Sequence, residues 1–238
     1  MTPPISIDGT DITGATIDGT DVQEITVDGD VVFSAGPTPF TEGFEAMSIG
    51  QSLDGFNGWF DNPDSFFADD NFTGDGNQFN TPGIAIGSPV NSAISKGQIG
   101  RNIPNQAYTD VSFFFGIDGS GDNKSVFVSL RQNGSDIIRV EIDDDGDGDD
   151  ADTIVNNTLI VDSQNESQGE IGNDFIANLF DFTIDYNSGA VSGSVESEKT
   201  GFSVSFNEPL LSTATGIDEI YLWRTGADGM LFDELDMR

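Results

Sequence analysis

From residue 40 to the end of the chain, short runs of alternating apolar and polar residues are separated by turn-forming residues, and no helical period is present. Residues 111–117 and 126–130 show the alternation most clearly, with Val, Phe, Ile or Leu at every second position. A period of two places such side chains on one face of a half-buried strand. This part of the chain therefore predicts strands.

The remaining segments fit the same pattern. Further strands are expected at Arg139–Ile142, Phe180–Tyr186, Ala190–Glu196, Phe202–Phe206, Ile217–Trp223 and Leu231–Met237. Asn133-Gly134, Asn187–Gly189 and Ala227–Gly229 are typical hairpin turns between adjacent pairs. Eight or more strands joined in this way predict an all-β, antiparallel two-sheet sandwich. Residues 180–185 could instead continue a short helix begun at Asp174, although their β-branched and aromatic residues favour a strand.

Residues 5–33 contain a threefold repeat with Asp8, Asp18 and Asp28 ten residues apart. Each unit is a β-branched run, an Asp-Gly pair suited to a tight turn, and a second run, which predicts a hairpin. Roughly thirty residues are too few to bury a core alone, so the module is expected to pair with copies of itself or with a neighbour. We therefore divide the chain into an attachment and oligomerisation module (1–36), a linker (37–40) and the sandwich (41–238).

The chain carries 42 Asp and Glu against 8 Lys and Arg, a formal net charge of −34, and the acids are scattered throughout. Such a surface repels itself at ordinary ionic strength, whereas near 1 M salt the Debye length falls to about 3 Å. The composition thus indicates adaptation to high salt. It also disfavours nucleic acid or anionic lipid as a partner, because neither supplies the opposite charge.

Neither cysteine nor histidine occurs in the sequence. Thiolate chemistry, disulfides and imidazole general bases are therefore excluded, which leaves an enzyme only carboxylate, hydroxyl or lysine groups. No run of 18 apolar residues predicts membrane insertion, and residues 1–6 do not resemble a secretory signal. We expect a non-enzymatic protein made without classical export.

Three motifs resemble the concanavalin A-like (LamG-type) jelly-roll superfamily: residues 41–45 with 55–59, the pair 182–186 and 191–195, and the closing Leu231–Asp236. The resemblance covers residues 41–238 and implies a lectin-like domain. The Ile/Val-Asp-Gly repeat resembles modules that precede such domains in structural proteins, such as turrets, spikes or fibres, of tailed viruses of halophilic archaea. That second resemblance covers about thirty residues.

The segment 143–152 (DDDGDGDDAD) places aspartates at alternate positions with glycines between them. Carboxylates with this spacing can surround a hard cation. The candidate ligands of a Ca²⁺ or Mg²⁺ ion are therefore Asp143, Asp145, Asp147, Asp149 and Asp152. The segment lacks the terminal Glu of an EF-hand. The alternative is a solvated acidic loop without metal.

The same region imitates the Glu-x-Asp-x-Glu strand of laminarinase-type glycanases through Glu141, Asp143 and Asp145. The third carboxylate is one methylene shorter than in that motif, and Asp144 puts a charge where an apolar residue normally faces the core. A retaining glycosidase needs its two carboxyl groups about 5 to 5.5 Å apart, so the shorter side chain counts against catalysis. A carbohydrate-active enzyme remains an alternative.

Aromatic side chains can bind a sugar by stacking on its ring. Tyr221 and Trp223 share one face of an expected strand, opposite Ile220 and Leu222, and together with Tyr108 are the predicted ligand-binding residues. Trp59 is interpreted as a structural core residue.

Together these features predict a virion structural or decoration protein, a turret, spike or tail fibre assembled in the host cytoplasm. It would contact other virion proteins through residues 1–36, form a homo-oligomer, and bind a host surface glycan or glycoprotein. The alternatives are the glycanase and a haloarchaeal surface adhesin.

Overall fold

We describe the protein from a computed structural model. The structure describes residues 6–7, 10–11, 16–17, 20–21, 24–27, 30–34, 38–44, 46–48, 51–60, 66–69, 85–87, 96–118, 124–144, 151–162, 178–197, 201–225 and 229–238.

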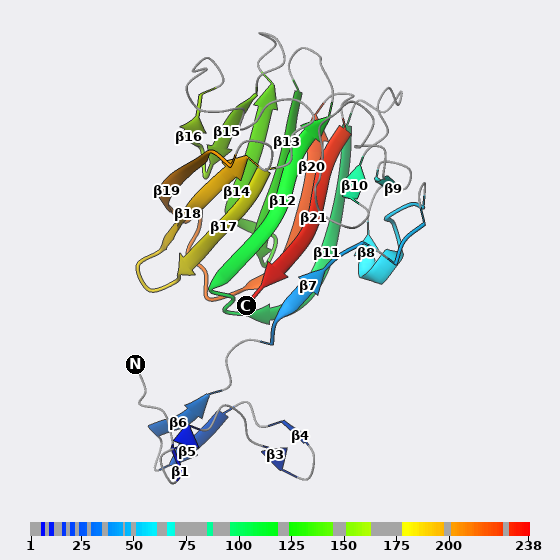
Figure 1. Ribbon diagram of the computed structural model, residues 1–238. Helices are drawn as coiled ribbons and strands as arrows, with labels where there is room; N and C mark the ends of the chain where they lie inside the picture. Colours follow the sequence, from blue (N-terminus) through cyan, green and yellow to red (C-terminus); the bar gives the residue numbers. More distant parts are fainter. Residues whose placement is uncertain are drawn as a thin grey trace.

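Two antiparallel sheets stack face to face (Figure 1). The eight-stranded sheet has the order β19 (Ser203–Pro209), β18 (Ala190–Ser197), β17 (Asn178–Asp185), β12 (Asp110–Asp118), β21 (Gly229–Met237), β10 (Ala85–Gly87) and β9 (Phe67–Asp69), and β7 (Phe40–Glu42) also pairs with β21. The seven-stranded sheet has the order β16 (Thr158–Val161), β15 (Asp152–Val155), β14 (Ser135–Asp144), β13 (Lys124–Gln132), β20 (Ile217–Thr225), β11 (Lys96–Gln106) and β8 (Trp59–Phe60), with the 3₁₀ turn η1 (Phe56–Gly58) before β8. The predicted two-sheet jelly-roll sandwich is confirmed.

The alternation along the strands builds the core between the sheets. On β12 the buried side chains are Val111, Phe113, Phe115 and Ile117, as the sequence period requires. Phe113 lies at the centre of an aromatic cluster, with its ring centroid 5.5 Å from that of Phe180 and 5.6 Å from that of Phe232. Trp59 is also buried, in line with its structural interpretation.

The segment 180–185 is extended within β17, so the helical alternative is wrong for these residues. Its burial alternates residue by residue, and both of its neighbours, β12 and β18, pair with it through backbone hydrogen bonds. Of the predicted turns, Asn133 and Gly134 both have positive φ, at 52° and 75°, as a two-residue hairpin demands.

The repeat forms three hairpins: β1 (Ser6–Ile7) with β2 (Thr10–Asp11), β3 (Thr16–Ile17) with β4 (Thr20–Asp21), and β5 (Glu24–Val27) with β6 (Asp30–Ser34). The Asp-Gly turn pairs themselves lie outside the described residues. The sandwich begins at β7, so Phe40, the last residue of the expected linker, is already paired with Met237. Within the described residues no helix is long and apolar enough to cross a membrane.

Candidate functional site

The seven-stranded sheet has one face on the core and one directed away from the other sheet, which we call the outer face. On β20, Ile220 and Leu222 are buried in the core, so the intervening Tyr221 and Trp223 project to the outer face. The register of β13 with β20 sets Phe127 opposite Trp223 and Ser129 opposite Tyr221. The two predicted aromatics therefore gain a third, Phe127, which sequence analysis missed because it falls between two core positions of its strand.

These three rings pack against each other. The Phe127 and Trp223 centroids are 4.6 Å apart, and Tyr221 meets Trp223 edge-on at 6.1 Å. Tyr221 and Phe127 are 9% and 7% exposed, whereas Trp223 is half-buried, so Trp223 offers the most accessible ring surface of the three. We call Tyr221, Trp223 and Phe127 the aromatic face.

A glycine extends this surface across β11. Gly100 pairs with Tyr221 on one side and with Phe60 of β8 on the other. A Cβ at this position would lie 3.0 Å from both the Phe60 and the Tyr221 rings, so only glycine lets the two rings converge without displacement. Phe60 is 39% exposed and borders the aromatic face.

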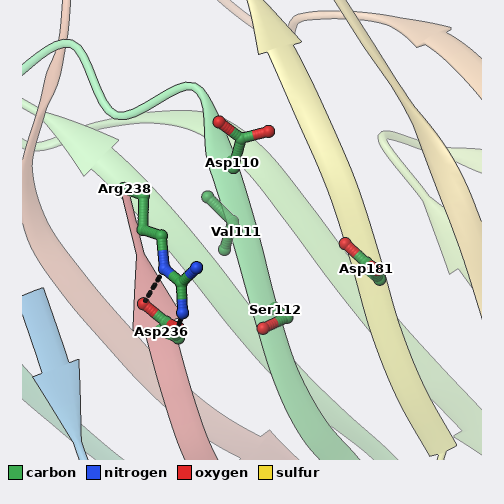
Figure 2. Close-up of a pocket in the computed structure, with 6 residues that line it drawn as sticks. All are labelled: Asp110, Val111, Ser112, Asp181, Asp236 and Arg238. Atoms are coloured by element: carbon green, nitrogen blue, oxygen red, sulfur yellow. Dashed lines mark hydrogen bonds and ion pairs between the residues drawn. The ribbon is translucent and has the colours of Figure 1, made fainter. Parts of the chain in front are cut away.

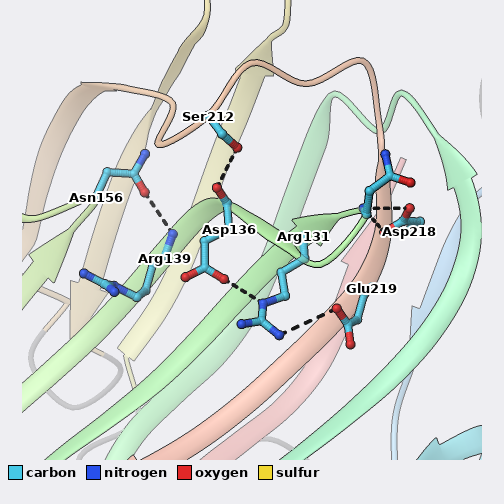
Figure 3. A network of polar contacts seen from close by, with 8 residues as sticks. Arg131, Asp136, Arg139, Asn156, Ser212, Asp218 and Glu219 are labelled. Atoms are coloured by element: carbon cyan, nitrogen blue, oxygen red, sulfur yellow. Dashed lines mark hydrogen bonds and ion pairs between the residues drawn. The ribbon is translucent and has the colours of Figure 1, made fainter.

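Arg131 of β13 covers part of the Tyr221 ring, with its guanidinium carbon 4.1 Å from the ring centroid. The same guanidinium donates from Nε to Asp136 at 2.6 Å and lies 3.7 Å from Glu219 (Figure 3). Burial raises the pKa of Glu219, an effect that Arg131 partly offsets. Both the stacking and the charge of Arg131 are therefore engaged within the protein.

Two further charged residues of β14 lie on the outer face. Glu141 is directly across from Phe127, and Arg139 is directly across from Ser129. Glu141 is half-buried, and desolvation, followed by the nearby Asp143 carboxylate, raises its pKa against the opposing effect of Arg139. A carboxyl group held in this way retains its proton more readily than an exposed one.

The predicted metal-binding segment is described only at its ends. Asp143 and Asp152 are cross-strand partners on β14 and β15, and the Ser125 hydroxyl donates to Asp143. Asp145, Asp147 and Asp149 lie outside the described residues. Among the described residues no group of three His, Cys, Asp or Glu side chains could hold a metal ion.

Tyr108 does not join the other two predicted ligand-binding residues. It is 0% exposed, its hydroxyl donates to the Pro104 carbonyl at 3.4 Å, and Gln106 donates to it at 3.3 Å. Burial raises the pKa of its phenol. A ring enclosed in the core offers no surface for stacking, so the prediction of ligand binding at Tyr108 is corrected to a packing role.

A shallow hollow of about 210 Å³ opens on the outer side of the eight-stranded sheet. Asp110, Val111, Ser112, Asp181, Asp236 and Arg238 line it (Figure 2). Arg238 is bound to Asp236 through two contacts of 3.2 and 2.6 Å, which raise the pKa of the guanidinium. Sequence analysis gave no sign of this hollow, because its carboxylates come together only through the pairing of β12 with β17 and β21.

No protein-family profile and no curated protein matches this sequence. Solved structures do match in fold. A sialidase shares 10% identity with a TM-score of 0.52 over 84% of this chain, which spans 18% of the sialidase chain. Peanut lectin shares 12% identity with a TM-score of 0.48, covering 84% of this chain and 97% of the lectin. The CBM2 module of the evolved Dit of Lactobacillus casei BL23 phage J-1 shares 9% identity with a TM-score of 0.43, covering 59% and 67% of the two chains.

Proposed function

We propose that the sandwich binds a saccharide on its aromatic face without reacting with it. The chain would serve as a structural or decoration protein in the virion of a halophilic tailed virus, where this binding mediates adsorption to a host glycan or glycoprotein. The observation that carries the binding proposal is the Trp223–Phe127–Tyr221 cluster on a sheet face directed away from the core.

Aromatic rings on an outward sheet face suit a sugar because the C–H faces of a pyranose are apolar while its rim carries hydroxyls. Trp223 supplies the accessible ring, and hydrogen-bonding groups surround it: Glu141 across from Phe127, and Gln98 across from Trp223 on β11. An apolar platform with a few convergent polar groups is the usual composition of a ligand site.

The experiment compares Trp223→Ala with Phe202→Ala on a glycan array of neutral and acidic saccharides. Phe202 is 36% exposed and precedes β19 of the other sheet, so it is a matched aromatic control. We expect Trp223→Ala to weaken binding about tenfold, equivalent to about 1.4 kcal/mol, and Phe202→Ala to leave it unchanged. Equal binding by both variants and the wild type would refute the aromatic face as the site.

The virion role is supported by the repeat of residues 5–33 and by the charge of −34. The strands of the repeat hairpins are two to five residues long. The backbone N–H and C=O groups at the outer edge of such a hairpin can pair with copies of the chain or with another virion protein. Several sandwiches in one particle would convert weak single-site binding into avidity. Immunogold labelling of purified particles tests this location.

The Asp-rich segment is proposed to bind Ca²⁺ or Mg²⁺ between β14 and β15. Asp143 and Asp152, which are the first and last residues of the segment, lie across from each other on β14 and β15. Millimolar Ca²⁺ should then raise the melting temperature, and Asp145→Asn with Asp147→Asn should abolish the increase. Identical melting in Ca²⁺ and in chelator would leave the acidic loop without metal.

A glycosidase is the second candidate, favoured by Glu141. Its raised pKa suits a general acid, and Asp143 projects from the same strand face two residues along. Release of reducing ends from a β-glucan, lost in Glu141→Gln, would favour the enzyme. Binding without release favours the lectin-like function.

A further inference from the structure

We propose that the saccharide bound on the aromatic face is acidic, and that Arg139 and Ser129 hold its carboxylate. This inference rests on the proposed function and names the class of ligand. The observation behind it is a second row of side chains across the strands, next to the Trp223–Phe127 pair. This row contains Tyr221, Ser129 and Arg139.

The two arginines of the outer face differ in what they bind. Arg131 is neutralised by Asp136 and Glu219, as described above. Arg139 makes no ion pair within the described part of the chain; its guanidinium donates to the side-chain oxygen of Asn157. Figure 3 shows its guanidinium directed away from the Arg131 network. Glu141 interacts with Arg139 at longer range, but no carboxylate among the described residues lies within ion-pair distance of it, so its guanidinium can bind both oxygens of an incoming carboxylate.

Ser129 provides the second contact. Its side chain is 0% exposed, and its hydroxyl has no hydrogen-bond partner among the described residues. An unsatisfied buried hydroxyl destabilises the fold, so an acceptor that reaches it recovers a hydrogen bond that the described residues do not make. A ligand reaches this covered hydroxyl only when neighbouring side chains shift, and a carboxylate oxygen can then accept from the hydroxyl and from the Arg139 guanidinium together.

The position of the pair relative to the rings fits one ligand. Arg139 lies directly across from Ser129, and its guanidinium carbon is 6.0 Å from the centroid of Phe127. The row that contains Trp223 and Phe127 and the row that contains Ser129 and Arg139 are two residues apart along the strand, or about 6.8 Å. A sugar ring stacked on Trp223, the accessible ring of the aromatic face, would therefore direct a ring carboxylate toward Ser129 and Arg139.

Several charges oppose an acidic ligand: the formal net charge of −34 repels it at long range unless salt screens the repulsion, and carboxylates also lie near the site. Glu141 faces the ligand from the row of Phe127, Asp143 follows it on β14, and Glu219 lies beyond Arg131. An ionised Glu141 repels a carboxylate, so Glu141→Gln, which keeps a hydrogen-bonding side chain, should strengthen binding of an acidic ligand more than that of a neutral one. The inference thus predicts opposite effects for two neighbouring residues of one strand.

The test uses an oligoglucuronate and its carboxyl-reduced counterpart, in which a hydroxymethyl group replaces each carboxylate; both are titrated calorimetrically in molar KCl. At this salt concentration long-range charge interactions are screened and contacts at hydrogen-bond distance remain effective, because the Debye length is about 3 Å. We expect the acidic ligand to bind at least about tenfold more tightly. Arg139→Gln should abolish the difference, Ser129→Ala should reduce it several-fold, and Glu141→Gln should increase it.

Arg238→Gln is the matched control, because Arg238 lies in the hollow of the opposite sheet and should not alter either affinity. Melting temperatures of all variants establish that they fold. Equal affinity for the two ligands, with both lost in Trp223→Ala, would overturn the acidic class and leave the proposed function standing. Failure to bind these ligands or any saccharide on the array would overturn both.

Discussion

The ion pair of Glu42 and Arg101 should make a large contribution to the stability of the sandwich. Glu42 is 3% exposed, and its carboxylate also accepts from Trp59 Nε1 and from Asn57 Nδ2, both at 3.4 Å. The Arg101 guanidinium lies 4.8 Å from the Phe40 ring centroid. These contacts join β7 of one sheet to β8 and β11 of the other, so Glu42 links the two layers where the sandwich begins.

The magnitude follows from the burial. Removing one partner of a buried pair typically costs 3 to 5 kcal/mol, because the remaining charge stays buried without compensation. The Arg101 side chain keeps 16% of its exposure and can reach water, so we expect Glu42→Gln to cost about 2 to 3 kcal/mol. For about 200 residues this corresponds to a melting temperature lower by roughly 4 to 12 °C.

The assay is equilibrium unfolding in urea at fixed high salt for Glu42→Gln, Arg101→Met and the double variant. The double variant should be more stable than the sum of the single losses predicts, because it leaves no uncompensated charge. Arg131→Met is the control, since Arg131 occupies a more accessible ion pair on the outer face. A loss below about 0.5 kcal/mol in both single variants, or strict additivity, would show that the pair does not couple the sheets.

Four further outcomes are expected. Burial raises the pKa of Glu141 above its ordinary 4.5, so ionising this carboxyl lowers the stability of the wild type as the pH rises above that value. Glu141→Gln, melted in the presence of chelator, should therefore be more stable than the wild type at pH 7. The difference in melting temperature should vanish near pH 4.5. Gly193→Ala should fail to fold or lose at least about 3 kcal/mol in urea unfolding, because its Cβ would lie 2.2 Å from the Asp181 carbonyl oxygen; a wild-type midpoint would contradict this close approach of strands. Melting temperature should rise between about 0.1 M and about 2 M KCl, and equal values would remove the high-salt interpretation. Circular dichroism should show that deleting 1–36 leaves a folded sandwich, while deleting 1–42 removes β7 and destabilises it.

The sequence was most informative where one face of a strand is apolar and the other polar. Strands such as β12 and β17 were predicted because every second residue of their central part is apolar. β11 was missed, although it is 11 residues long, because its sequence KGQIGRNIPNQ is mostly polar and contains glycine and proline. Its position between β20 and β8 supplies backbone partners on both sides, so pairing compensates for weak intrinsic preference.

The short hairpin of β15 and β16 was missed for a different reason. Its turn is Asn156-Asn157, and both residues have positive φ, at 50° and 69°. Asparagine tolerates this conformation better than most residues, so the pair is a turn signal in its own right. Asn156 also accepts from the Arg139 backbone at 2.8 Å and donates to the Pro209 carbonyl at 2.8 Å, which fixes the turn against β14 and β19.

The candidate site shows what alternation alone cannot supply. Tyr221 and Trp223 could be assigned to one face from the spacing along β20, but Phe127, Ser129 and Arg139 come to that face from other strands. Which residue lies across from which depends on register, and a shift of one residue in β13 would turn Phe127 and Ser129 into the core. The register observed instead keeps Val126, Val128 and Leu130 inside, so the packing of the core determines which polar groups meet the aromatic rings. A change that alters ligand class without altering stability should therefore be sought at Ser129 and Arg139, because neither contributes an apolar side chain to that core.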